Sequence, residues 1–254
     1  MTWSAGALAP RPEAAPRSAM LRSQMRAELS LIVRNSEQLL LNLVIPLVLL
    51  VLLTKISIVD VPGRRVDFFV PGIMALAVMS SSFTGQAIAT GFDREYGVLK
   101  RLGATPLPRQ VLLLAKTLAT LTVLLGQLLV IALVGLALGW HPHGDPLSLL
   151  AVLALGTAAF SGLGLLLGGT LRGLQSLAVA NVLWFALLLA GGILFPLGKY
   201  GGGEQVLRLL PSASLSDGLR SVLIHAALPG RDLLYLAVWA VASLGAAAKA
   251  FRWE

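Results

Sequence analysis

The stretch TLATLTVLLGQLLVIALVGLALGWHPHG, residues 117–144, contains no Asp, Glu, Lys or Arg. After the single acid Asp145, a second charge-free stretch covers residues 146–171, and after Arg172 a third covers residues 173–198. A helix needs about 20 apolar residues to cross a hydrocarbon layer about 30 Å thick. Each stretch is long enough to do so, and together they predict an all-α integral membrane protein.

Three further charge-free stretches lie outside this block, over residues 38–54, 68–92 and 233–248. The first and the last are short, but Lys55 and Lys249 at their ends can extend their aliphatic stems along the apolar layer. Charged residues make up 13% of the chain, about half of the ~25% found in an average soluble domain. The sequence therefore predicts a six-span transmembrane domain over residues 38–254 and excludes a water-soluble globule.

The positions of the basic residues predict the orientation, because cytoplasmic loops of membrane proteins collect Lys and Arg. With the N-terminus inside, 13 of the 20 Lys and Arg lie on the inner side, while the 12 acids divide equally. The net charge of +8 is thus explained by topology, with no need for a nucleic-acid partner. We expect a multi-pass protein of the cytoplasmic (inner) membrane with both termini inside.

The segment before the first span divides into two parts. Residues 1–19 contain three prolines and no periodic apolar pattern, so we expect a disordered cytoplasmic tail; they also lack the apolar core of a signal peptide. In residues 20–37, apolar residues recur at helical spacing beside Arg22 and Arg26. This pattern predicts an amphipathic helix on the inner membrane surface, in contact with lipid, or else a plain extension of the first span.

The loop before the last span, residues 199–232, contains a helix signal of its own. Ser214 and Asp217 follow Pro211 and have the spacing of a capping box. Apolar residues then recur at helical spacing. This predicts a short extracellular amphipathic helix that dips into the outer membrane interface.

The loop DREYGVLKRLGATPLPR, residues 93–109, is the long inner connection between two spans. Its spacing predicts a short helix over residues 93–103. Gly103 can cap the end of this helix, and Pro106 prevents the helix from continuing. A rigid, charged helix joined tightly to two spans is suited to transmit force from a cytoplasmic partner. An ordinary positively charged loop is the alternative.

This loop resembles the ATP-binding-cassette (ABC) type-2 transporter permease family, the membrane subunits of drug-exporter-like systems. The resemblance covers about residues 20–250. Its inner part consists of Arg94, Glu95, Gly97, Leu99, Lys100, Arg101, Leu102, Thr105, Pro106 and Lys116. Its outer part consists of Gly191, Gly192, Phe195, Pro196, Leu210, Pro211, Leu219 and Arg220. Val98 departs from the family pattern, in which many members have Thr.

The resemblance implies the permease subunit of an ABC exporter, which pairs with a second permease copy and binds two copies of a cytoplasmic ABC ATPase. It implies that coupling to the ATPase involves Arg94, Glu95, Gly97, Leu99, Lys100, Arg101 and Pro106. ATP and Mg would be bound by that partner. The chain itself has no G-x-x-x-x-G-K-[ST] motif, so we expect a transporter subunit that is not an enzyme and has no cofactor of its own.

Cysteine is absent from the sequence, which removes disulfides, thiolate catalysis and cysteine metal sites from consideration. His141, His143 and Asp145 are metal ligands by type. They lie on one short Pro- and Gly-containing loop, and we expect a solvated loop there and no metal or catalytic site in the chain.

Several uncharged polar residues lie within the predicted spans, and they either bond helices together or line a substrate path. The candidate path residues are Asn42, Ser81, Ser82, Thr84, Gln86 and Asn181. A path without charged walls suits a hydrophobic or amphiphilic substrate such as a drug, a lipid or a lipid-linked glycan.

Two other functions are compatible with a six-span protein. An ion-coupled secondary transporter usually carries ionisable residues inside its spans, and no Asp or Glu lies within these charge-free stretches, although amides and carbonyls can also bind sodium. A non-transporting membrane scaffold would not need the polar run over residues 80–86.

Overall fold

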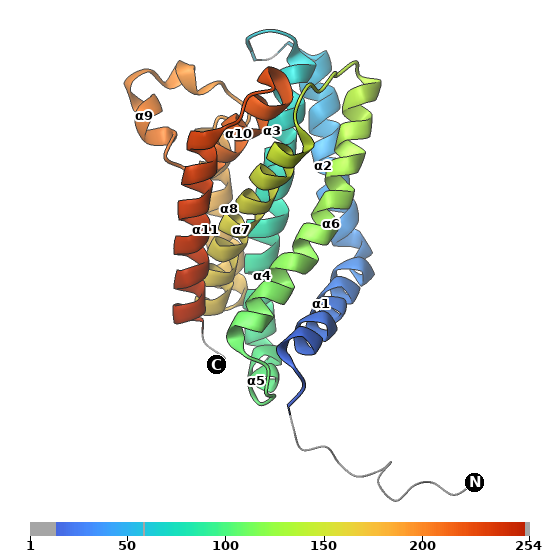
Figure 1. The fold of residues 1–254 in the computed structure, drawn as a ribbon, viewed down its shortest axis with the longest axis vertical. Helices are drawn as coiled ribbons and strands as arrows, with labels where there is room; N and C mark the ends of the chain where they lie inside the picture. The colour runs from blue at the N-terminus through green and yellow to red at the C-terminus, as the bar shows by residue number, and fades with distance from the viewer. Residues whose placement is uncertain (1–13, 58, 252–254) are drawn as a thin grey trace, which may run out of the picture.

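The computed structural model describes residues 14–57 and 59–251, which form helices joined by loops, with no strand among them (Figure 1). Six helical segments are long and apolar enough to cross a membrane, which confirms the predicted all-α, six-span fold. These spans are α2 (Ser36–Lys55), α3–η1–α4 (Arg65–Glu95), α6 (Arg109–Ala137), α7 (Pro146–Thr170), α8 (Gly173–Ala190) and α11 (Gly230–Ala250).

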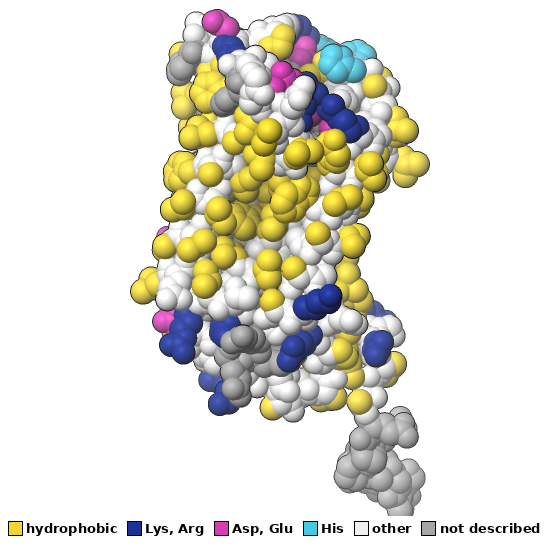
Figure 2. Space-filling model, turned by 90° about the vertical axis from the view of Figure 1, so that its left-hand side faces the viewer, with side chains coloured by type: hydrophobic (Ala, Val, Ile, Leu, Met, Phe, Trp, Pro, Cys, Tyr) yellow, Lys and Arg dark blue, Asp and Glu magenta, His cyan; other side chains and the backbone are white. Residues whose placement is uncertain are grey.

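The spans run along the long axis of the molecule, so that the bundle has two distinct ends (Figure 1). The short helix α5 (Val98–Gly103) lies at one end, together with both ends of the described chain. The helices α9 (Glu204–Leu207) and α10 (Pro211–His225) lie at the other. We call these the α5 end and the α10 end. Between them, one face shows a broad band of hydrophobic side chains, with charged residues above and below it (Figure 2).

The third and fifth spans differ in length from the charge-free stretches that predicted them. The third, α6, begins at Arg109, eight residues before the charge-free stretch, and so contains Lys116. It ends at Ala137, two residues before Gly139, whose φ is 86°. The fifth, α8, ends at Ala190 because Gly192 adopts a φ of 67°. Such a left-handed conformation is costly for most residues but not for glycine, and it turns the chain away from the helix axis.

The second span is the centre of the bundle. It consists of α3 (Arg65–Met79), the π-helix η1 (Ser80–Gly85) and α4 (Gln86–Glu95). Of its most apolar part 83% is buried, against 11% for α2 and 22% for α8. A π-helical turn inside a longer helix often marks a functional position.

The fourth span, α7, packs against the second with backbone almost touching backbone. A Cβ atom added to Gly164 would lie 2.5 Å from the Phe83 carbonyl oxygen, and one added to Gly168 would lie 2.5 Å from the Ala87 carbonyl oxygen. These glycines have the small-xxx-small spacing that permits close helix contact in membranes. Larger side chains there would push the two spans apart.

The N-terminal helix α1 (Arg17–Arg34) starts earlier than predicted, directly after Pro16, so residues 17–19 belong to a helix and not to the tail. Residues 1–13 of the predicted tail lie outside the described residues. The helix also ends earlier, because Asn35 leaves the helical conformation and its side chain accepts a 3.3 Å hydrogen bond from the Gln38 backbone N–H. Residues 36–37 therefore begin α2. α1 packs against α6.

The single helix predicted over residues 93–103 is divided in two. α4 continues to Glu95, and α5 starts at Val98 after a turn at Gly97, whose φ is 71°. Asp93, Arg94 and Glu95 thus belong to the second span, and the short helix is α5 alone.

The helix predicted near Ser214 is α10, and it starts at Pro211, so the predicted capping box is wrong: Leu210 is the N-cap. It follows η2 (Leu197–Gly203) and α9. The amphipathic surface helix that was predicted would expose one side. Instead, most of α10 is buried on all sides, because α3, α7, α8 and α11 pack around it.

Candidate functional site

At the α5 end, one short helix combines a buried anchor with an exposed surface. Leu99 is fully buried in an apolar cluster with Leu112, Leu113, Leu165 and Phe251. The cluster draws on α6 and α7 and on the residue that follows α11. A displacement of α5 would therefore disturb the packing of α6, α7 and α11 together.

The opposite side of the same segment is open. Tyr96 is 68% exposed, and Val98, Lys100 and Arg101 are also exposed. An aromatic ring and two cations on a helix that protrudes from the bundle are suited to contact another protein, since aromatic residues and Arg are enriched at protein interfaces.

A buried ion-pair triad lies beside this segment and joins three helices. The Lys116 side chain of α6 is 6% exposed, and its Nζ lies 3.0 Å from Oε2 of Glu28 in α1 and 2.9 Å from Oδ2 of Asp93 in α4. The other Glu28 oxygen accepts a 2.8 Å hydrogen bond from Gln24. Two carboxylates facing one ammonium compensate for its removal from water. The triad therefore holds α1, α4 and α6 together.

Arg94 and Glu95, the last two residues of α4, face the connection from α7 to α8. Arg94 Nη1 donates a 2.6 Å hydrogen bond to the carbonyl oxygen of Gly169, at the C-terminal end of α7, where cations are favourable. Glu95 is exposed, yet a Cβ added to Gly173, the first residue of α8, would lie 2.3 Å from its Oε2. Both side chains thus lie where α4 meets its neighbours.

The structure brings the residues implied in coupling into one corner of the molecule. Arg94 and Glu95 end α4, Gly97 forms the turn, and Lys100 and Arg101 are exposed on α5. Leu99 is buried, and Pro106 is exposed in the loop between α5 and α6. The Lys116 triad was not predicted, because spacing along the chain does not reveal that Glu28, 88 residues away, pairs with it.

In the middle of the bundle, η1 forms hydrogen bonds with α6 and α8, and through α6 it is connected to α2. Ser80 Oγ accepts a 2.9 Å bond from Nε1 of Trp184 in α8. Ser81 Oγ donates to Oε1 of Gln127 in α6 at 3.2 Å, and Gln127 Nε2 in turn donates to the carbonyl oxygen of Asn42 in α2 at 2.5 Å. The π-helical turn is therefore a polar junction between spans.

Gln86, one residue past η1, extends this junction. Its Nε2 donates to Thr120 Oγ1 in α6 at 3.0 Å and to Ser161 Oγ in α7 at 2.8 Å. With these bonds, the centre of the second span is hydrogen-bonded to α6, α7 and α8, and Gln127 of α6 connects it to α2.

The predicted path residues are only partly gathered at this junction. Ser81, Gln86 and the backbone of Asn42 belong to it. The hydroxyls of Ser82 and Thr84 are buried without a hydrogen-bond partner among the described residues. Asn181 is exposed on α8 and takes no part in the bonds of the junction. A sequence pattern indicates which residues are polar, but the partners depend on how the spans are packed.

Asp145, considered above as a metal ligand, is the N-cap of α7. It accepts hydrogen bonds from the backbone N–H of Ser148 at 2.8 Å and from the Ser148 hydroxyl at 2.9 Å. These bonds lower the pKa of Asp145 below its ordinary value. The residue therefore has a structural role at a helix start.

The sequence matches a known family over most of its length. The sequence model of the ABC-2 type transporter family matches residues 21–224, which run from α1 to the last turn of α10. The chain belongs to this family. Together with the six apolar spans, this identifies a multi-pass membrane protein that is a transport permease.

A similar protein is found in Bacillus subtilis (strain 168) under the name "Putative transport permease YvfS". It is 26% identical to this chain over 182 residues, which cover 70% of this chain and 74% of that protein.

Proposed function

We propose that this chain is the membrane-spanning subunit of an ABC exporter of the cytoplasmic membrane, powered by ATP that a separate subunit hydrolyses. Two permease copies and two ATPase subunits would form the transporter, with the α5 end in the cytoplasm and both termini there. Membership of the ABC-2 family supports this proposal. The observation that carries it is the geometry of α5, which has an exposed outer side and one leucine buried among three spans.

In this mechanism the ATPase subunit contacts the exposed side of α5 and moves it when ATP binds. Leu99 transfers the displacement to the apolar cluster of α6, α7 and α11. The Lys116 triad transfers it to α1, and Arg94 transfers it to the end of α7. Because each contact is packed or bonded, a short helix can move several spans as one body.

We further propose that the substrate is hydrophobic or amphiphilic. The polar groups at the η1 junction are uncharged amides, hydroxyls and an indole. Such groups can exchange hydrogen bonds with a passing molecule but cannot compensate for a desolvated charge. Drugs, lipids and lipid-linked glycans have the required mixture of apolar and neutral polar surface.

The test is transport in vesicles that contain the purified chain with or without the ABC ATPase that co-purifies with it. ATP should drive movement of a lipophilic fluorescent dye only when both proteins are present. Movement by the chain alone, unaffected by ATP, would show that the proposal is wrong.

Glu95→Ala tests the role of the α5 corner within that assay. We expect normal insertion and continued ATP hydrolysis, but at least tenfold less transport per ATP, since the link between α4 and the ATPase is weakened. Glu37→Ala, which removes an exposed carboxylate from the first turn of α2, is the matched control and should transport normally. Full transport by Glu95→Ala would exclude this role for Glu95.

A further inference from the structure

At the α10 end, three arginines donate hydrogen bonds to backbone carbonyls where spans end. Arg65 is the most heavily bonded of them. Its guanidinium donates to the carbonyl oxygen of Leu53 at 3.0 Å, to that of Val59 at 2.7 Å and to that of Ile56. The span α2 ends at Lys55, so Arg65 caps its C-terminus.

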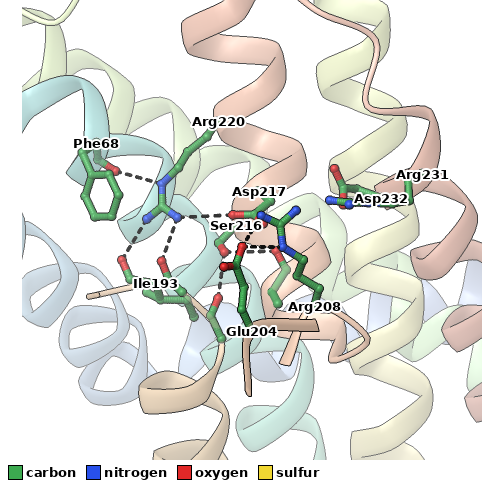
Figure 3. Close-up of polar contacts among 12 residues, drawn as sticks. Phe68, Ile193, Glu204, Arg208, Ser216, Asp217, Arg220, Arg231 and Asp232 are labelled. Atoms are coloured by element: carbon green, nitrogen blue, oxygen red, sulfur yellow. Dashed lines mark hydrogen bonds and ion pairs between the residues drawn. The ribbon is translucent and has the colours of Figure 1, made fainter. Parts of the chain in front are cut away.

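Arg64 and Arg220 donate to the turns that follow two other spans. Arg64 Nη2 donates to the Gly139 carbonyl oxygen at 2.6 Å, just after the end of α6. Arg220, in α10, is 8% exposed. It donates to the carbonyl oxygens of Gly192 at 2.7 Å and Ile193 at 3.1 Å, just after the end of α8 (Figure 3).

The helices α2, α6 and α8 are the spans that run into this end and stop there. The last carbonyls of a helix have no partner within the helix, and they carry the negative end of its dipole. An arginine placed against them satisfies both needs. Arg65, in the first turn of α3, does this for Leu53 in the last turn of α2. Arg64, the N-cap of α3, and Arg220, in α10, donate to carbonyls two or three residues past the ends of α6 and α8, and they hold the turns that follow those spans.

Two of the arginines, Arg65 and Arg220, are linked through the first turns of α3. The Arg220 guanidinium lies 3.8 Å from the centroid of the Phe68 ring, and its Nε donates to the Phe68 carbonyl oxygen at 3.5 Å (Figure 3). The Phe68 ring packs edge-on against Phe69 at 5.3 Å, and Arg65 lies 5.3 Å from the centroid of the Phe69 ring. Cation–π and aromatic contacts thus connect Arg65 to Arg220.

The fit between α3 and the turn after α8 depends on small residues. A Cβ atom added to Gly72 would lie 2.7 Å from the Ile193 carbonyl oxygen. On the other side of the turn, Ser216 of α10 donates a 2.8 Å hydrogen bond to the Gly191 carbonyl oxygen. The turn is therefore held between α3 and α10, with Arg220 bonded to both α3 and the turn.

We propose that Arg64, Arg65 and Arg220 form an arginine clamp that closes the α10 end of the bundle between transport cycles, and that Arg220 releases the end of α8 when the substrate leaves. The proposal rests on the transport function proposed above. In this proposal the arginines are positioning residues, because they hold the ends of spans and the turns that follow and do not contact the substrate. The weak burial of α2 and α8 makes these bonds an important part of what holds those two ends.

Burial makes Arg220 the member that depends most on its carbonyl partners. Desolvation lowers the pKa of Arg220 to about 10, and Asp217, whose Oδ1 lies 3.7 Å from Nη1, only partly compensates. Arg65 and Arg64 are more exposed than Arg220. A guanidinium that is costly to bury remains there only while its carbonyl partners are in place.

The experiment uses a cysteine reporter, which is clean because the chain has no cysteine. Ser212 of α10 is fully buried, its hydroxyl has no hydrogen-bond partner among the described residues, and it lies against Gly191. Ser212→Cys therefore places a thiol against Gly191, the residue before the carbonyls that Arg220 holds, without the loss of a bond. The rate of labelling by a polar maleimide, measured in detergent-opened vesicles without ATP, reports how often the clamp opens.

Adding Arg220→Lys to the reporter should raise the labelling rate about tenfold, since lysine keeps the charge but cannot donate to two carbonyls from one planar group. Arg231→Lys is the matched control. Its side chain is half exposed and its contact within this cluster is Asp232, 3.5 Å away (Figure 3), so labelling should stay within about twofold of the parent. Equal labelling in Arg220→Lys and the parent would overturn the proposal.

Two further measurements keep the test decisive. If Arg220→Lys does not insert, Phe68→Leu, which removes the ring beneath the guanidinium, should raise labelling about threefold, and unchanged labelling would overturn the clamp. With the ATPase present, ATP should speed labelling of the parent reporter. A lack of ATP-driven dye transport would overturn the proposed function alone, because the ATP-free comparison of variants does not depend on it.

Discussion

The two ends of the bundle differ in the chemistry of most of their helix contacts, although Arg94 at the α5 end also donates to a backbone carbonyl, that of Gly169. At the α5 end, the ammonium of Lys116 pairs with two carboxylates, so side chains of opposite charge join α1, α4 and α6. At the α10 end, arginines donate to backbone carbonyls at or just after the ends of α2, α6 and α8. Both sets of contacts involve the second span, which contributes Asp93 at one end and Arg65, next to its N-cap Arg64, at the other.

This difference indicates what each end is sensitive to. An ion-pair triad depends on charge balance, because one unpaired charge in a buried place is costly. A guanidinium on carbonyls depends on geometry, because its planar fork is matched to several acceptors. Removal of charge should therefore disturb the α5 end most, and a change of shape at constant charge should disturb the α10 end most.

The largest effect is expected from Lys116→Met. It leaves the Glu28 and Asp93 carboxylates side by side without a cation, which should cost about 3 kcal/mol of stability. Thermal unfolding in detergent measures this loss. Lys100→Met, at an exposed position of α5, should unfold like the parent, and equal unfolding of both variants would mean that the triad adds nothing to stability.

A charge-preserving exchange at each end should give unequal losses. Arg65→Lys keeps the cation but loses most of the bonds to the end of α2, which should cost about 1–2 kcal/mol. Lys116→Arg also keeps the charge and should cost less than Arg65→Lys, since two carboxylates can accept from a guanidinium. The comparison is made by denaturant or thermal unfolding of the two variants under the same conditions. If the order is reversed, the contrast between charge and geometry is wrong.

The spans were predictable because the length of an apolar stretch is a local property of the sequence. The exact ends of α6 and α8 were harder to predict, since they depend on a positive φ at Gly139 and Gly192. Many other glycines in the described residues have a negative φ, and the sequence does not distinguish the two kinds. The residues implied in coupling, at the end of α4 and in α5, were singled out by the resemblance, while the contacts around them were not. Glu28 and Lys116, or Arg220 and the end of α8, are far apart in sequence, and only the packing of the spans brings them together.

The smallest effect concerns Asp217, the acid beside the clamp. Burial raises its pKa, against the opposing influence of Arg220 and then Arg208, so folding favours the protonated carboxyl. The stabilising contribution of this proton is complete below the unfolded value of about 3.9 and is lost as the pH rises through the higher folded value. Stability of the parent should fall by less than about 1 kcal/mol over that window, and Asp217→Asn should remove this fall.

Thermal unfolding between acidic and neutral pH measures this fall in stability. Asp60→Asn, which changes an exposed acid, is the control. If the pH profile is the same in Asp217→Asn and the parent, the titration of Asp217 does not contribute to the pH dependence of stability. The position of Arg220 would then be explained by its hydrogen bonds to backbone carbonyls, without an ion pair to Asp217.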